Sequence, residues 1–123
     1  MRPERTGKRE NNRNAHLKPE ERQALEEFVW LVREFCGNMV KEIRLFGSKA
    51  RGDDRSNSDI DVLIIVNERD PQLDDQILEA AFKVGLKLDV LLIPVVFTQE
   101  EYYSPLAKKT LFYENTQREA IPL

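Results

Sequence analysis

The run DIDVLIIV at residues 59–66 constrains the fold of this chain more than any other stretch of its sequence. Its second half is apolar on both faces, which is typical of a central strand in a sheet that is covered on both sides. Side chains alternate along a strand, so Asp59 and Asp61 share one face while Ile60 and Val62 share the other. We expect Ile60 and Val62 to face the hydrophobic core, which places the two carboxylates together on the opposite face.

Hydrophobic periodicity and turn residues predict the elements around this strand. In chain order they are a helix from Lys18 to a stop at Gly37, strands at 40–46 and 59–66, a helix at 72–84 closed by Gly85, a third strand at 87–93 stopped by Pro94, a helix start with a capping box at 98–101, and a helix from Ser104 to about Asn115. This order predicts an α/β (α+β) fold, with a small mixed β-sheet and flanking helices.

Length and composition indicate one globular domain, because the chain has 123 residues, 41% of them hydrophobic and 33% charged. Cys36 is the only cysteine, which excludes a disulfide framework and a cysteine-based zinc site. No apolar run approaches the roughly 20 residues that a membrane-spanning helix needs. The polar N-terminus also lacks the apolar region of a signal peptide. We therefore expect a cytoplasmic protein.

The N-terminal segment differs in charge from the rest of the chain. Its first 18 residues contain six Lys or Arg and two Glu, whereas the whole chain has a formal net charge of −3. Because hydrophobic periodicity is lacking there, we expect residues 1–17 to form a flexible basic arm and residues 18–123 to form a single domain. The arm could contact nucleic acid or an acidic partner, or it could simply be solvated. The acidic remainder argues against a nucleic-acid partner, since phosphate neutralisation dominates that affinity.

The carboxylates of Asp59 and Asp61 need a positive partner, because two carboxylates side by side repel and are costly to bury unpaired. Asp89 is likewise a carboxylate within an otherwise apolar run, the predicted third strand. If that strand neighbours residues 59–66, three carboxylates converge on one edge of the sheet. Oxygen-only ligation is the preference of Mg²⁺ or Mn²⁺, and the trio would suit a pair of such ions bridged by a phosphate. Taken singly, each aspartate could instead be a strand-end cap or a turn residue.

Gly47 and Ser48 follow the strand at 40–46 and are expected to open a short helical turn that Gly52 ends. Glycine lets a phosphate approach the backbone, and the amides of a helix start, with the Ser hydroxyl, can bind its oxygens. The spacing is not that of a Walker loop. Alone, a Gly-Ser pair usually indicates only a turn. It becomes evidence for a phosphate site through the residues that follow it.

Taken together, these motifs resemble the DNA polymerase beta-like nucleotidyltransferase superfamily. GS at 47–48, ten further residues and DID at 59–61 reproduce its GS-x10-D-x-D signature. The string GSKARGDDRSNSDIDVLI is similar to the minimal nucleotidyltransferases (MNT), whose pattern reads roughly GSxARG…SDxDL. The resemblance spans about residues 40–93. Asp89 matches the family's third carboxylate, while Lys49 stands where Arg is common.

The resemblance implies a role for each of these residues. Asp59 and Asp61 would bind magnesium, and Asp89 would complete the metal site and help to deprotonate the attacking hydroxyl. Gly47 and Ser48 would hold the triphosphate of ATP, while an acceptor hydroxyl attacks the α-phosphorus and pyrophosphate leaves. Two Mg²⁺ ions, or Mn²⁺ in their place, would be the cofactors. Arg51, in the same turn, would neutralise phosphate charge, or it is a solvated helix residue.

The resemblance also implies a partner, because no second domain that could hold an acceptor is predicted. Stand-alone proteins of this kind are typically encoded beside a HEPN-domain ribonuclease toxin and transfer AMP from ATP to a tyrosine of that toxin. We therefore expect an adenylyltransferase antitoxin with a HEPN protein as substrate and partner. Two alternatives stay open: a non-catalytic antitoxin that acts by complex formation, and the nucleotidyl-transfer subunit of a two-chain enzyme acting on a small molecule.

Overall fold

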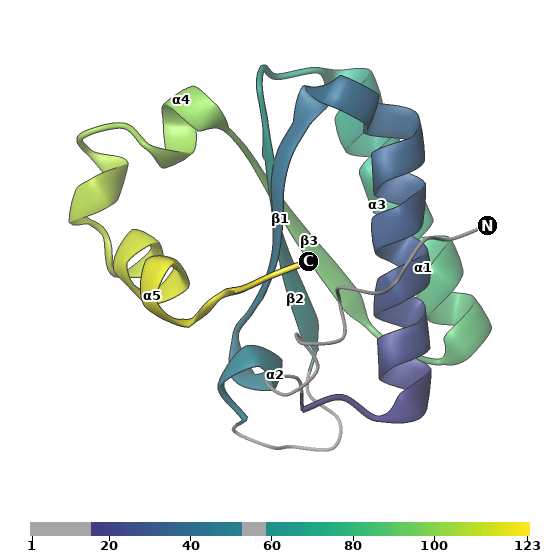
Figure 1. The fold of residues 1–123 in the computed structure, drawn as a ribbon. Helices are drawn as coiled ribbons and strands as arrows, with labels where there is room; N and C mark the ends of the chain where they lie inside the picture. Colours follow the sequence, from purple (N-terminus) through teal and green to yellow (C-terminus); the bar gives the residue numbers. More distant parts are fainter. Residues whose placement is uncertain (1–15, 53–58) are drawn as a thin grey trace.

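A computed structural model describes residues 16–52 and 59–123 of the chain. Its elements are α1 (Pro19–Cys36), η2 (Gly37–Met39), β1 (Val40–Phe46), α2 (Ser48–Arg51), β2 (Ile60–Val66), α3 (Pro71–Leu88), β3 (Leu92–Thr98), α4 (Gln99–Tyr102), η3 (Ala107–Lys109), α5 (Leu111–Glu119) and β4 (Ile121–Pro122). Figure 1 shows α1 and α3 on one side of the sheet, α4 and α5 on the other, and α2 at one end. This arrangement confirms the predicted mixed fold. Within the described residues, no helix is long and apolar enough to cross a membrane.

The four strands form a mixed sheet in the order β3-β2-β1-β4. β1 is antiparallel to β2 and β4, with Phe46 opposite Asp61, whereas β2 and β3 are parallel, with Ile60 opposite Leu92. The end of β1 and the starts of β2 and β3 therefore lie side by side, at one end of the strands. We call this end of the sheet the α2 edge, because α2 follows β1 there.

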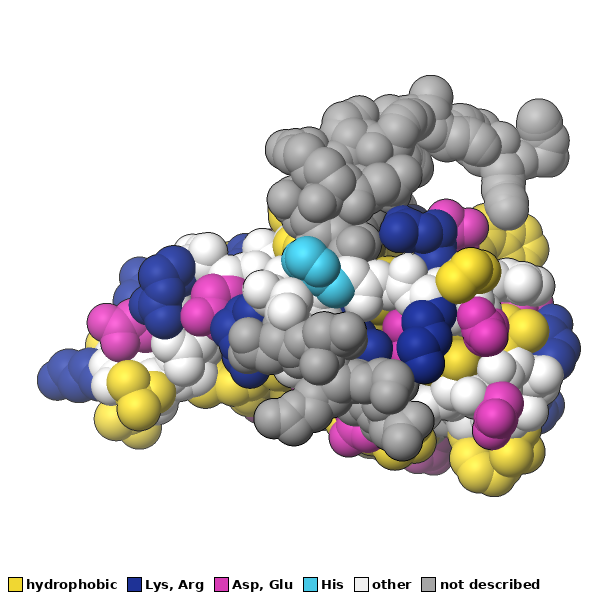
Figure 2. All heavy atoms as spheres, turned by 90° about the horizontal axis from the view of Figure 1, so that it is seen from below, with side chains coloured by type: hydrophobic (Ala, Val, Ile, Leu, Met, Phe, Trp, Pro, Cys, Tyr) yellow, Lys and Arg dark blue, Asp and Glu magenta, His cyan; other side chains and the backbone are white. Residues whose placement is uncertain are grey.

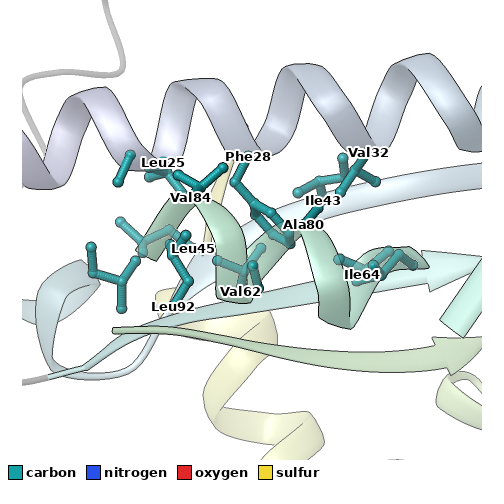
Figure 3. Close-up of a cluster of buried hydrophobic side chains, with 14 of the residues drawn as sticks. Leu25, Phe28, Val32, Ile43, Leu45, Val62, Ile64, Ala80, Val84 and Leu92 are labelled. Atoms are coloured by element: carbon teal, nitrogen blue, oxygen red, sulfur yellow. The ribbon is translucent and has the colours of Figure 1, made fainter. Parts of the chain in front are cut away.

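The main hydrophobic core fills the space between the sheet and the pair α1 and α3. Ile60, Val62 and Ile64 of β2 are completely buried in it, as alternation along the strand predicts. Figure 3 shows Val62 and Ile64 beneath Phe28 of α1 and Ala80 of α3. The expectation that Ile60 and Val62 face the core is confirmed, so Asp61 lies on the other face of β2.

An aromatic cluster covers that other face. Tyr102 of α4 is buried against Leu63 and Ile65 of β2, and its hydroxyl is hydrogen-bonded to that of Thr116 in α5. Partly buried aromatic side chains from β1, β3, α5 and the α4–η3 connection surround it: Phe46, Phe97, Tyr103, Phe112 and Tyr113. An edge-to-face contact between Phe46 of β1 and Phe112 of α5, with 5.4 Å between ring centroids, helps to hold α5 on the sheet.

The predicted strand at 87–93 is wrong. The helix α3 continues through Leu88, and β3 begins at Leu92 and runs past Pro94 to Thr98. Proline was expected to stop a strand because it cannot donate a backbone hydrogen bond. It is tolerated here because β3 is the last strand on its side of the sheet, where a missing amide need not disrupt the ladder.

Gly85 does not close α3, although the sequence predicts that it does. It lies buried inside the helix, and a Cβ at this position would come within 2.5 Å of the carbonyl oxygen of Val90. The amide of Val90 in turn donates to the carbonyl of Gly85 at 2.9 Å. The glycine is therefore explained by the close return of the chain after α3 rather than by the helix end.

The C-terminal third contains one correct and one incorrect prediction. The capping box is confirmed, because Thr98 Oγ1 accepts from the Glu101 amide and Glu101 Oε1 accepts from the Thr98 amide, both at 3.0 Å. The continuous helix at 104–115 is wrong. Thr110 interrupts it by accepting a hydrogen bond from the Tyr113 amide at 3.1 Å, which caps the start of α5. The short strand β4 was not predicted.

Candidate active site

A tight turn joins β1 to α2 at the α2 edge. Gly47 has a φ of 81°, a conformation that favours glycine, and its carbonyl accepts hydrogen bonds from the amides of Ala50 and Arg51 at 3.1 Å. The amide of Gly52, with a φ of 87°, donates to the carbonyl of Ser48 at 2.8 Å and ends α2. The predicted glycine–serine turn, residues 47–52, is therefore confirmed as local structure.

Gly47 and Asp61 meet at this edge. Asp61 pairs with Phe46, the residue before Gly47, and its side chain lies over the glycine. A Cβ at position 47 would lie 2.2 Å from Asp61 Oδ2 and 3.1 Å from its Cγ, so a side chain there would displace the carboxylate. The two ends of the motif are thus in contact, with the carboxylate of Asp61 directly against the backbone of the turn.

The electrostatic surroundings of Asp61 are unfavourable for a carboxylate. Burial raises the pKa of Asp61 above its ordinary value, and the neighbouring charge of Asp59 raises this pKa further. Arg51 lowers the same pKa by a smaller amount. The site therefore combines a half-buried carboxylate, an exposed carboxylate beside it and a guanidinium that offsets part of their repulsion.

Arg51 joins the turn to the last helix. Its Nη1 lies 3.5 Å from Oε1 of Glu119 in α5, and its side chain is 41% exposed. This contact is compatible with either expectation for Arg51, because the guanidinium is partly solvated yet influences Asp61. The sequence offered no signal for Glu119, since contacts between distant elements leave no local pattern.

Lys49 is the residue of the turn whose role was missed. Its side chain is 2% exposed, and its Nζ lies 3.0 Å from Oε2 of Glu21 in α1, which is 8% exposed. The other oxygen of Glu21 accepts from the Lys18 amide at 2.8 Å and caps α1. This buried ion pair therefore fastens the glycine–serine turn to the start of α1. Only the unusual Lys in place of the family's Arg could have pointed to it.

His16 lies beside the turn. An ideal Cβ at Gly52 would come within 2.7 Å of its Nε2, so the imidazole covers the end of α2. Figure 2 views this end of the molecule, with the single histidine of the chain in cyan between dark blue Lys and Arg side chains. Leu17 packs against the main core. Residues 1–15 of the predicted basic arm lie outside the described part of the chain, and the boundary at residue 18 stays a prediction.

Asp89 does not lie in a strand, contrary to prediction. It caps the C-terminus of α3 in a left-handed conformation, with a φ of 59°, and its side chain is exposed. It precedes β3, which begins beside Ile60, so it belongs to the same end of the sheet. The structure nevertheless assembles only Asp59 and Asp61, because no group of three metal-ligating side chains occurs among the described residues. A role of Asp89 at the metal stays a prediction.

Asp59 and Asp61 fit a divalent cation by the chemistry of their oxygens. Mg²⁺ usually binds proteins through one or two carboxylates and completes its shell with water and substrate phosphates. The mutual repulsion of Asp59 and Asp61, and the burial of Asp61, are conditions that such a cation would relieve. This pair therefore suits a cation shared with a phosphate ligand rather than one enclosed by protein alone.

Comparisons with known proteins bear on the family of this chain. The model of the family described as Nucleotidyltransferase domain matches residues 20–117. Two Methanocaldococcus jannaschii proteins, named "Putative protein adenylyltransferase MJ0141" and "Putative protein adenylyltransferase MJ0604", are 34% and 36% identical to this chain. The alignments cover 61% and 65% of this chain, and 77% and 76% of those proteins.

Two further matches differ in extent. Spectinomycin 9-adenylyltransferase of Staphylococcus aureus is 44% identical over 43 residues, which are 35% of this chain and 16% of that protein. A solved structure described as "Structure of putative minimal nucleotidyltransferase" superposes with a TM-score of 0.54 and 27% identity. This superposition covers 88% of this chain and 98% of that one, so the likeness extends over nearly the whole domain.

Proposed function

Because this chain belongs to the nucleotidyltransferase domain family and is a nucleotidyltransferase, we propose that it transfers AMP from ATP to a tyrosine hydroxyl of a HEPN ribonuclease toxin, and so neutralises that toxin. A protein acceptor is supported by the two archaeal relatives, which are named as protein adenylyltransferases. The HEPN partner rests on the resemblance of the motif at 47–61 to the minimal nucleotidyltransferases.

The contact between Gly47 and Asp61 is the observation that carries this proposal. A triphosphate bound at the glycine–serine turn would lie next to the carboxylate that covers Gly47, because no side chain separates the two. Ser48 is the first residue of α2, and we expect its hydroxyl and the first amides of the helix to bind a phosphate oxygen. Asp59 and Asp61 would hold Mg²⁺, which supplies charge neutralisation to the phosphates when bound.

The chain's own residues would then orient a nucleotidyl transfer. The tyrosine oxygen of the acceptor forms a bond to the α-phosphorus, the bond to the β-phosphate oxygen breaks, and pyrophosphate leaves. The proton of the tyrosine passes to a nearby base, for which Asp89 is our candidate from the motif. Arg51, whose charge already influences Asp61, would share the negative charge of the phosphates.

Mass spectrometry of the toxin tests this proposal. The protein is incubated with ATP, Mg²⁺ and the HEPN protein encoded beside it, and the intact mass and modified residue of the HEPN protein are determined. We expect a gain of one or more AMP groups on tyrosine and loss of ribonuclease activity. The double variant Asp59→Ala/Asp61→Ala should abolish both, while Glu114→Ala, which removes an exposed carboxylate of α5, should change neither.

Two other outcomes would replace the proposal. Neutralisation that survives in the double variant, without any gain of mass, would show an antitoxin that acts by complex formation. The match to spectinomycin 9-adenylyltransferase motivates the other arm of the experiment. Adenylylation of spectinomycin or related aminoglycosides, with no modification of the HEPN protein, would show a small-molecule acceptor.

A further inference from the structure

The outer face of α3 carries large apolar side chains that are more than half exposed. Leu78, Phe82 and Leu86 are 56%, 66% and 68% exposed. They are spaced four residues apart, so they form one continuous ridge about 12 Å long on the side of α3 away from its buried residues. We call these three residues the outer stripe. A contiguous apolar ridge on a surface helix is characteristic of an interaction site.

A row of four charges runs beside the outer stripe as the next ridge of the helix. In chain order it consists of Asp75, Glu79, Lys83 and Lys87, two acids followed by two bases. All four side chains are exposed, and the pair Glu79–Lys83 is joined at 3.0 Å within the helix. We call these residues the charge row. Its sign changes at the middle of the helix, close to Phe82 at the centre of the stripe.

This pattern is self-complementary. When two copies of α3 lie antiparallel across a two-fold axis, each row of one helix faces the same row of the other. Leu78 then lies opposite Leu86 of the second copy, and Phe82 opposite Phe82. In the charge row Lys83 then lies within about 3 Å, along the helix axis, of the level of Glu79 of the second copy. A partner with a different sequence would not require the charges of α3 to reverse sign about their centre.

We propose that the outer face of α3 pairs antiparallel with the same face of a second copy of this chain. Trp30 of α1, 51% exposed, is a further exposed apolar side chain of the helical layer. It lies one turn from Glu27, which is joined to Lys87 of α3 at 2.6 Å, and on the side of α1 opposite the buried residues. The contact covers the helical layer of α1 and α3. It leaves Asp61 accessible, because that carboxylate lies on the other face of the sheet.

Measurement of the molar mass in solution tests the pairing. Sedimentation velocity of the full chain over a range of concentrations should give the mass of a dimer at the higher concentrations. Phe82→Glu should give a monomer, since it places two carboxylates at the two-fold axis. The matched control Leu106→Glu changes a side chain that is 77% exposed but lies beyond the aromatic cluster, and it should remain dimeric. A wild-type chain that is monomeric throughout would overturn the proposal.

Charge reversal then tests the orientation. Glu79→Lys and Lys83→Glu should each weaken the dimer by about tenfold, because each turns two attractive contacts into repulsive ones. The double variant should restore the wild-type affinity. The same charge reversals, made in the Phe82→Glu monomer, show whether they change the stability of the monomer itself. If none of these variants weakens the dimer, α3 is not the antiparallel contact. The same conclusion follows if the double variant loses the affinity that both single variants lose together.

Discussion

The carboxylate of Asp61 lies half-buried at the start of β2, against the backbone of Gly47 and beside Asp59. Burial and the neighbouring charge both raise its pKa, so its ionised form lowers the free energy of unfolding of the ligand-free chain. A carboxylate chosen for stability alone would not be placed here. We propose that a bound cation offsets the repulsion between the two carboxylates.

The variant Asp61→Asn separates stability from activity. Removing the charge should raise the free energy of unfolding of the ligand-free protein by about 1 kcal/mol, while lowering nucleotidyl transfer on the order of a hundredfold or more. Urea unfolding without divalent cations measures the first effect. Glu26→Gln, which neutralises an exposed carboxylate of α1, is the matched control and should leave both quantities unchanged. A destabilised Asp61→Asn would mean that the carboxylate is structural.

The variant Gly47→Ala tests the contact between the turn and the carboxylate. Its methyl group would overlap Asp61 Oδ2 at 2.2 Å and would adopt a φ of 81°, so we expect a loss of about 2–3 kcal/mol in stability and a loss of transfer activity. Gly37→Ala is the control, because Gly37 also has a positive φ, of 54°, but has nothing within 4 Å of its Cβ position. If the two variants lose the same stability, the close contact with Asp61 adds nothing to the effect of alanine at position 47.

At the scale of elements, a buried ion pair joins α2 to α1. Lys49 of α2 and Glu21 of α1 bring the glycine–serine turn against the first helix. A buried charge left without its partner is strongly destabilising, whereas the removal of both charges often costs little. The pair therefore helps to fix where the glycine–serine turn stands relative to the core.

A double-mutant cycle measures this coupling. Glu21→Gln keeps an oxygen for the capping bond to Lys18 but loses the charge, and should cost about 3 kcal/mol and raise the KM for ATP. Adding Lys49→Met should recover part of that stability, giving a coupling energy above about 1 kcal/mol. The exposed pair Glu79–Lys83 is the reference and should couple by less than about 0.5 kcal/mol in the Phe82→Glu monomer. Additive costs at positions 21 and 49 would contradict the anchoring role.

The connection after α4 is joined to β1 by Tyr103, whose hydroxyl donates to Glu42 at 2.5 Å and accepts from Arg44 at 3.2 Å. Burial and the Glu42 carboxylate raise the pKa of Tyr103 to about 12. Because the pKa is raised in the folded state, the Tyr103 hydroxyl makes its full contribution to the free energy of unfolding below about pH 10, the unfolded pKa. That contribution is lost as the pH rises toward 12. Tyr103→Phe should therefore be less stable than wild type at pH 8, with a smaller loss between pH 10 and 12. Parallel urea-unfolding profiles for the two proteins would refute this.

Local sequence patterns predict elements well where the deciding contacts are local. The helix ending at Gly37, the strand at 40–46 and the capping box at Thr98 all follow from neighbouring residues. Gly85 and Pro94 misled the prediction of β3, because their positions depend on contacts with Val90 and on the place of β3 at the sheet edge. Both are tertiary facts, which composition and spacing do not contain.

At the scale of the whole molecule, the sheet separates two surfaces. The α1 and α3 layer closes one face, and the aromatic cluster with α4 and α5 covers much of the other (Figure 1). The candidate site lies at the α2 edge, where β1 ends and β2 begins. The resemblance of the motif at 47–61 to the minimal nucleotidyltransferases led us to expect Gly47 and Asp61 in one site. The anchoring of Lys49 by Glu21 could not be predicted, since the two residues belong to separate elements that only folding brings together.

Transfer of label from ATP tests the central claim most directly, that the contact of Gly47 with Asp61 is a site for nucleotidyl transfer. The protein, Mg²⁺ and the neighbouring HEPN protein are incubated in parallel with ATP labelled at the α-phosphorus and at the γ-phosphorus. We predict that the α-label becomes attached to the HEPN protein, that the γ-label appears only in pyrophosphate, and that Asp61→Asn abolishes both. Attachment of the γ-label would show phosphoryl transfer instead, and undiminished α-labelling by Asp61→Asn would contradict the site described here.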